Sequence, residues 1–165
     1  MLIGGLKCTY VLRSGIKCII KMFIGEYKHT LDAKNRLAIP SKFRKELGKK
    51  AVITRGLDEC LLLYSIEAWK EIAVKLGQMP IGESGTRGFV RLMLAGATEV
   101  SLDGLGRVLV PEYLKKYAGL KKDTIVNGLF NRMEIWEAED WNNYKQRTEK
   151  DTAKVAEKLG ELGIY

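Results

Sequence analysis

The chain has 165 residues, of which 46% are hydrophobic, and a formal net charge of +8. This length allows one domain or two very small ones, and no run of about 18 apolar residues exists that could cross a membrane. Three cysteines, Cys8, Cys18 and Cys60, lie far apart without companion histidine pairs, which argues against a disulfide framework and a zinc site. We therefore expect that the protein binds no metal and no cofactor and that it lies in a reducing cytoplasm.

Positive charge is concentrated in the first half of the chain. Residues 1–21 hold four basic residues and no acidic residue, and residues 22–78 hold eleven basic and seven acidic residues. Residues 97–150 hold nine of each. A basic protein can bind nucleic acid, but basic proteins also bind membranes, so the location of the charge is more informative than its total.

The first 21 residues are predicted to lie outside the fold. Their apolar stretches are interrupted by Lys17 and Cys18, and no small-residue cleavage pattern follows, so a signal peptide is not expected. Met22 is followed at once by a patterned strand. We interpret residues 1–21 as an N-terminal extension that is either disordered or an over-extended start.

The next segment, HTLDAKNRLAIP at 29–40, predicts a β-hairpin, and VSLDGLGRVLVP at 100–111 repeats its pattern 71 positions later. Each copy places three loop residues between an aspartate and an arginine, and three-residue hairpin loops end in a residue of left-handed conformation. Asn35 and Gly106 occupy that position, and these residue types tolerate positive φ. Asp32 and Asp103 are predicted to stabilise the turns by accepting hydrogen bonds from loop amides.

Each hairpin is followed by the same series of predicted elements. A short helix begins at Pro40 or Pro111 and stops at Gly48 or Gly119, and two strands and a longer helix come next. The predicted boundaries are a first domain at 22–78, a linker and connecting helix at 79–96, a second domain at 97–150 and a C-terminal helix at 151–165. Because a unit of about 50 residues is marginal alone, we expect the two repeats to interlock around a pseudo-twofold axis.

The runs MFIGEYKHTLDAKNRLAIPSKFR and FVRLMLAGATEVSLDGLGRVLVPEYL, together with the paired DxxxR turns, resemble the MraZ family of bacterial regulators. The resemblance covers residues 22 to about 150. It implies an α+β fold of two tandem swapped-hairpin SpoVT/AbrB-like β-barrel units, double-psi-like, with peripheral helices. It also implies a cytoplasmic, nucleoid-associated transcription factor. Such proteins form homo-oligomeric rings and bind direct repeats in double-stranded DNA upstream of the division and cell-wall genes, which they repress.

In this family the DxxxR loops contact DNA, which implies contacts from Lys34, Asn35, Arg36 and Arg107. A guanidinium can donate two parallel hydrogen bonds to a guanine edge, whereas lysines contact phosphates without reading sequence. Arg36 is thus the predicted base reader. The predicted phosphate contacts are Lys28, Lys34 and Lys42. The second loop, GLG, has no cation at the position of Lys34, so the sequence does not decide whether this loop contacts DNA directly.

Other interpretations stay open from the sequence alone. Arg36 and Arg107 could brace the turns by pairing with the aspartates, and Lys28 and Lys42 could be solvated surface charges. The terminal segment, with apolar residues at 155, 159 and 162, could pack on its own domain or on a neighbouring subunit. An AbrB-type antitoxin or protein-binding module acting through a protein partner is the alternative function. No nucleophile motif, P-loop or HExxH motif is present, so enzymatic activity is not expected.

Overall fold

The computed structural model describes residues 8–11, 17–20 and 22–161, with side chains from 22 to 150. The expectation for residues 1–21 falls mostly outside the described residues; β1 (Cys8–Val11) and β2 (Lys17–Ile20) pair there as antiparallel strands. The first repeat contains β3 (Phe23–Thr30), β4 (Arg36–Ala38), α1 (Ser41–Leu47), β5 (Lys50–Arg55), β6 (Leu61–Ser65) and α2 (Ile66–Gly77). The second contains β7 (Thr98–Ser101), β8 (Arg107–Leu109), α4 (Glu112–Tyr117), β9 (Asp123–Phe130), β10 (Arg132–Glu137) and α5 (Ala138–Glu161). Helix α3 (Ser84–Gly96) joins the two repeats, and the α+β class is confirmed.

The repeats exchange strands within one antiparallel sheet. Its order is β3-β9-β10-β6-β5-β7, so the first strand of each repeat pairs with the other repeat. In the two repeats β3 corresponds to β7, β5 to β9 and β6 to β10. Interchanging the repeats therefore gives the same strand order read from the other edge of the sheet. Strands β6 and β10 meet at the centre, and β4 pairs with β8 in a separate two-stranded ladder. A pseudo-twofold axis therefore passes between the members of both pairs.

The main hydrophobic core draws on both repeats. Leu37 and Ile39 of the first repeat and Val108 and Val110 of the second are almost completely buried in a single cluster. These residues alternate along β4 and β8 and the segments that follow, so one face of each strand is apolar. Because neither repeat can bury this face alone, the strand pairing and the core depend on each other.

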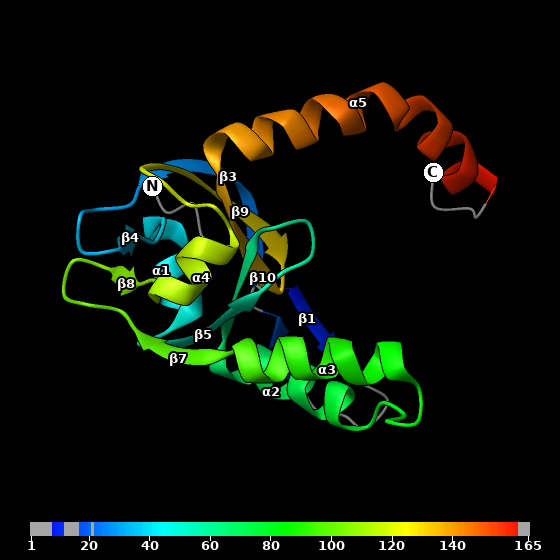
Figure 1. Ribbon diagram of the computed structural model, residues 1–165, viewed down its shortest axis with the longest axis horizontal. Coiled ribbons are helices and arrows are strands. Elements are labelled where there is room, and N and C mark those ends of the chain that lie inside the picture. Colours follow the sequence, from blue (N-terminus) through cyan, green and yellow to red (C-terminus); the bar gives the residue numbers. More distant parts are fainter. Residues whose placement is uncertain (1–7, 12–16, 21, 162–165) are drawn as a thin grey trace.

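The short helices are held by the same core. Helix α1 buries Phe43 and Leu47 and is followed by Gly48 at φ 84°. Helix α4 buries Leu114, which corresponds to Phe43 at the repeat offset. The glycine permits the left-handed conformation that ends α1 without the strain a side chain would introduce. Both helices lie beside the β4–β8 ladder (Figure 1).

A smaller cluster covers the outer face of the sheet. Cys60, Ile125 and Trp136 are buried there, and Trp141 and Tyr144 of α5 pack on them. Their aromatic rings lie 5.1 to 5.8 Å apart between centroids, within the range of favourable ring pairs. Trp141 is thus a packing residue in this structure.

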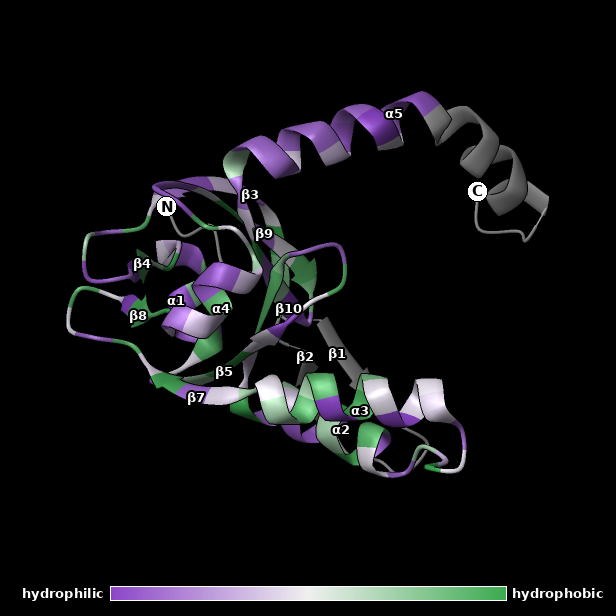
Figure 2. Ribbon diagram, in the orientation of Figure 1, coloured by the Kyte–Doolittle hydropathy of each residue, from purple (hydrophilic) through white to green (hydrophobic). Residues whose placement is uncertain are grey.

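Helix α5 is a single helix of 24 residues, where the sequence suggested two segments with a boundary at residue 150. After its first turns it leaves the body of the protein (Figure 1), and its described side chains are mainly hydrophilic (Figure 2). Residues 146–150 are all exposed. Over the described part of the chain, no helix is both long and apolar enough to span a membrane, and no cluster of potential metal ligands occurs.

Candidate nucleic-acid interface

The first DxxxR loop is a tight turn organised by Asp32. Its Oδ1 accepts hydrogen bonds from the backbone amides of Lys34 and Arg36, each at 2.9 Å. Its Oδ2 accepts a hydrogen bond from Arg36 Nε at 2.7 Å. Asn35 lies at φ 56°, the left-handed conformation that ends a three-residue hairpin loop.

The second loop repeats this geometry bond for bond. Asp103 Oδ1 accepts from the amides of Leu105 and Arg107, each at 2.9 Å, and its Oδ2 accepts from Arg107 Nε at 2.8 Å. Gly106 takes the position of Asn35, at φ 74°. The similarity follows from the shared spacing of aspartate, loop end and arginine.

Pairing of β4 with β8 places the two loops side by side. The register sets Leu37 opposite Val108, at the centre of the short ladder. Arg107 Nη1 then lies 3.7 Å from Asp32 Oδ2, so an ion pair crosses from one loop to the other. We call residues 32–36 and 103–107 together the paired loops. They form one surface rather than two separate sites.

Each short helix supports the loop of the other repeat. On the first loop, Asn35 Nδ2 donates to Glu112 Oε2 and Lys115 Nζ donates to Asn35 Oδ1, both at 2.8 Å. On the second loop, the Arg44 side chain covers the α-carbon of Gly106, where an added Cβ would lie 2.6 Å from Arg44 Cδ. Arg44 and Lys115 occupy equivalent positions at the repeat offset of 71. Each loop therefore has a cation from the opposite repeat beside it.

Sequence reasoning missed Arg44, Glu112 and Lys115. Their roles depend on strand exchange, which brings together residues about 70 positions apart. The repetition of a basic residue at 44 and 115 was a signal that could have found two of them. A hollow of about 540 Å³ beside the second loop is lined in part by Arg44 and Lys49, so this loop has nearby cations although it carries none at the position of Lys34.

The two arginines differ in how firmly they are held. Arg107 contacts Asp103 through Nε and Nη2 and Asp32 through Nη1, and its side chain is 24% exposed. Among the described residues, Arg36 is hydrogen-bonded to Asp32 through Nε, and its side chain is 35% exposed. Both arginines therefore stabilise the turns by pairing with aspartates. The terminal nitrogens of Arg107 contact Asp103 and Asp32, whereas Arg36 contacts Asp32 through Nε.

The remaining predicted contacts lie around the first loop. Lys34 is exposed at the loop itself, and Lys28 is exposed on β3. Lys42 is exposed at the start of α1, with Nζ 5.7 Å from the centre of the Tyr27 ring. Lys28 lies opposite Ile125 of the smaller cluster, so its side chain is on the outer face of the sheet, whereas Lys34 lies in the loop and Lys42 lies on α1.

The pKa values of both turn aspartates are lowered in the folded protein. The side chain of Arg107, followed by its backbone N–H, lowers the pKa of Asp103 to about 2. The backbone N–H of Arg36 is the largest cause that lowers the pKa of Asp32. Both carboxylates remain charged at neutral pH, so they hold the arginines but cannot act as proton donors there.

Acid should therefore weaken the fold through these turns. A carboxyl group whose pKa is depressed by folding binds fewer protons folded than unfolded, so its contribution is complete above the unfolded value of 3.8 and is lost as pH falls toward about 2. We expect the free energy of unfolding to fall over this window in urea titrations. Asp103→Asn, which removes one titrating group, should show a shallower fall. An equal slope in both proteins would contradict the expectation.

The chain is similar in sequence to known proteins over most of its length. The chain matches the sequence profile described as "MraZ protein, putative antitoxin-like" twice in tandem, over residues 22–92 and 93–161. The chain belongs to the MraZ family. Curated MraZ relatives from Acetivibrio thermocellus, Clostridium tetani and Clostridium acetobutylicum, each called "Transcriptional regulator MraZ", are 46%, 47% and 50% identical over 143 residues. Each alignment covers 87% of this chain and all of the relative.

The MraZ profile divides the chain within α3, at residues 92 and 93. The two matched segments each contain one DxxxR loop and one short helix. The family resemblance inferred from the sequence is therefore confirmed, and it extends through α5 rather than ending near residue 150.

Proposed function

We propose that this chain is a sequence-specific DNA-binding transcriptional regulator of the MraZ type and that the paired loops form its DNA-binding surface. The observation that carries the proposal is the β4–β8 pairing, which presents both DxxxR loops and cations from both repeats on one surface. Arginine and lysine side chains displayed in this way suit a DNA groove and its phosphates. The names of the curated relatives support the same function.

Within this surface, we assign base reading to Arg36. Its side chain is the more exposed of the two loop arginines, and Asp32 holds it through one nitrogen. Lys28, Lys34 and Lys42 contact phosphates in this proposal, and Asn35 orders the loop through Glu112 and Lys115. Arg107 serves chiefly to connect the loops, because its three nitrogens face Asp103 and Asp32.

One copy presents few cations, so tight binding requires several copies on one DNA. A homo-oligomeric ring that presents several paired loops to successive direct repeats would gain affinity through effective concentration. The exchange of strands between repeats supports a relation to swapped-hairpin barrels of the SpoVT/AbrB type. In this proposal the protein acts in the cytoplasm, on the nucleoid, and represses the division and cell-wall genes.

A binding titration with the DNA upstream of the chain's own gene tests the function. We expect retardation of this fragment in a gel shift and no comparable retardation of a shuffled fragment of equal length. The logarithm of affinity should fall linearly with the logarithm of salt concentration, because bound lysines and arginines release counterions. Capture of a small toxin from cell extract without any DNA retardation would favour the antitoxin alternative instead.

A further inference from the structure

The hollow beside the second DxxxR loop carries an excess of positive charge. It has a volume of about 540 Å³ and lies between the end of α1, the start of β5 and the second loop. Arg44, Lys49 and Lys50 line it, and Asp103 is the one acidic residue among its described lining residues. Both oxygens of Asp103 accept hydrogen bonds, from the loop amides and from the Arg107 side chain. The hollow therefore offers cations to a ligand rather than a free carboxylate.

Two of these cations have no acidic partner within the part of the chain that the structure describes. Lys50 Nζ lies 2.6 Å from Glu99 Oε1, so that charge is paired. Lys49 is exposed, and its side chain makes no hydrogen bond to a described residue. Arg44 donates from Nε to the carbonyl oxygen of Ile39 at 2.8 Å, which leaves its terminal nitrogens available. An arginine and a lysine beside one hollow can together bind a phosphate group.

The corresponding corner of the first loop is closed by protein side chains. There Asn35 takes the place of Gly106, and its side chain accepts a hydrogen bond from Lys115 and donates one to Glu112, both at 2.8 Å. Lys115 is the counterpart of Arg44 at the repeat offset of 71. In the first loop the equivalent cation is therefore bonded to the loop itself, with an acidic side chain beside it.

The second loop lacks the groups that close this corner. Gly106 has no side chain, and Ser41 of α1 stands at the position of Glu112. A Cβ added at Gly48 or at Gly104 would meet no atom within 4 Å, so the space above both glycines is open. The two repeats thus differ at this corner in both bulk and charge, and an anion can approach the backbone closely between α1 and the second loop.

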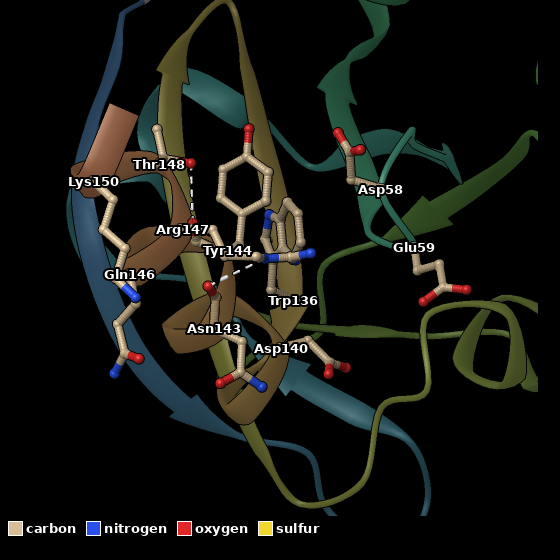
Figure 3. A pocket seen from close by; sticks show the side chains of 10 residues that line it. All are labelled: Asp58, Glu59, Trp136, Asp140, Asn143, Tyr144, Gln146, Arg147, Thr148 and Lys150. Atoms are coloured by element: carbon tan, nitrogen blue, oxygen red, sulfur yellow. Dashed lines mark hydrogen bonds between the residues drawn. The ribbon is translucent and has the colours of Figure 1, made fainter. Parts of the chain in front are cut away.

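A larger hollow elsewhere in the molecule does not share this charge. It has a volume of about 770 Å³, and Figure 3 shows Asp58 and Glu59 of the β5–β6 turn on one side of it and residues of α5 on the other. Asp140, Arg147 and Lys150 also line it, so its acidic residues outnumber its basic ones. The lining beside the second loop has the opposite balance. Positive charge is therefore a local feature of that hollow and does not simply follow from the net charge of the chain.

We infer that the hollow beside the second loop binds a phosphate group through Arg44 and Lys49. A guanidinium can donate two parallel hydrogen bonds to phosphate oxygens, and an ammonium group adds a compact charge. The phosphate belongs either to the backbone of bound DNA or to a free oligophosphate. The DNA source rests on the proposed function, and it would give the second loop a contact although its sequence, GLG, carries no cation. The free source would place an anionic ligand directly beside the paired loops.

Titration calorimetry of the full chain with sodium tripolyphosphate at low salt tests the free source. We expect the wild type to bind this probe and Lys49→Gln and Arg44→Gln each to bind it about tenfold more weakly, the loss expected for one hydrogen bond to a charged group. Lys70→Gln removes an exposed lysine of α2 and is the matched control, which should bind like the wild type. Thermal unfolding checks that each variant is folded.

A charge placed in the hollow gives a second test. Ala33 of the first loop occupies the position of Gly104, and a Cβ at Gly104 meets open space, so the loop accepts a side chain there. Gly104→Glu should abolish binding of tripolyphosphate by repulsion. Gly104→Gln has the same shape without the charge and should retain binding. Equal binding by Gly104→Glu and the wild type would contradict the site.

The salt dependence of DNA binding tests the other source of the phosphate. In Lys49→Gln the slope of log affinity against log salt concentration should become shallower by about 0.9 for each copy whose hollow holds a backbone phosphate. The preference for upstream DNA over the shuffled fragment should stay, because phosphate contacts carry no sequence information. An unchanged slope together with weakened tripolyphosphate binding identifies a free phosphate as the occupant. A shallower slope without tripolyphosphate binding identifies the DNA backbone.

The inference is overturned if Lys49→Gln and Arg44→Gln change neither measurement, or if Lys70→Gln changes them as much. The proposed function is scored separately. Tripolyphosphate binding by a chain that does not retard its upstream DNA would refute the proposed function and leave the phosphate site standing. Retardation of the upstream DNA with wild-type behaviour of every hollow variant would do the reverse.

Discussion

Arg36→Ala is expected to abolish specific retardation of the upstream DNA, whereas Arg107→Ala should reduce it less. A bidentate arginine contact with guanine contributes about 1–3 kcal/mol of discrimination per base pair, and the loss is repeated in every copy that binds. Arg36 is held to Asp32 through Nε, while Arg107 is held to Asp103 and Asp32 through three nitrogens. Gel shifts over a protein titration, with a shuffled fragment beside the specific one, measure the difference.

Two controls separate base reading from turn bracing. Arg36→Lys keeps the charge but loses the planar guanidinium that can donate two parallel hydrogen bonds. This variant should therefore still bind the shuffled fragment but lose the preference for the upstream DNA. Lys70→Ala removes an exposed charge of α2, which lies away from the β4–β8 ladder (Figure 1), and should leave that preference intact. Equal loss of specific binding in Arg36→Ala and Arg107→Ala would show that both loops contribute alike and that our ranking is wrong.

Gly128→Ala is expected to cause a large loss of stability. Gly128 lies opposite Gly25 where β9 pairs with β3 of the other repeat. A Cβ at Gly128 would lie 2.6 Å from the backbone of Phe23 and Ile24 and 2.8 Å from the Phe43 ring. Since backbone in a paired strand cannot move aside as a side chain can, we expect a cost of about 3 kcal/mol or more.

This cost corresponds to a fall in Tm of about 6–12 °C for a domain of this size. Gly88→Ala is the matched control, because Gly88 lies within α3, where a Cβ would meet open space, and alanine favours the helix. Its Tm should stay the same or rise slightly. A Gly128→Ala protein with wild-type Tm would mean that β3 and β9 do not approach each other closely enough to exclude a methyl group.

The loss of stability would also affect the paired loops, which form the proposed DNA-binding surface. Strand β3 leads into the first loop, and its pairing with β9 fixes where that loop begins, as the bond from Leu31 N to Lys122 O at 2.8 Å shows. A displaced β3 would disturb the contact between Asn35 and α4. Stability and the geometry of the paired loops are thus coupled through strand exchange.

Local geometry followed from the sequence. The spacing of aspartate, loop end and arginine was enough to predict both turns, because Asn35 and Gly106 are residue types that accept positive φ and an aspartate at the start of a loop accepts its amides. The internal repeat predicted the order of elements in each half. These features depend on residues within a few positions of one another.

The arrangement of the loops was decided only by the tertiary structure. Arg44 lies beside Gly106, and Lys115 beside Asn35, because β3, β4, β7 and β8 pair across the repeats. No local pattern carries this information, since each strand can pair with a neighbour in its own repeat or in the other. The exchanged arrangement places Leu37 opposite Val108 in one core, so the burial of both side chains favours it.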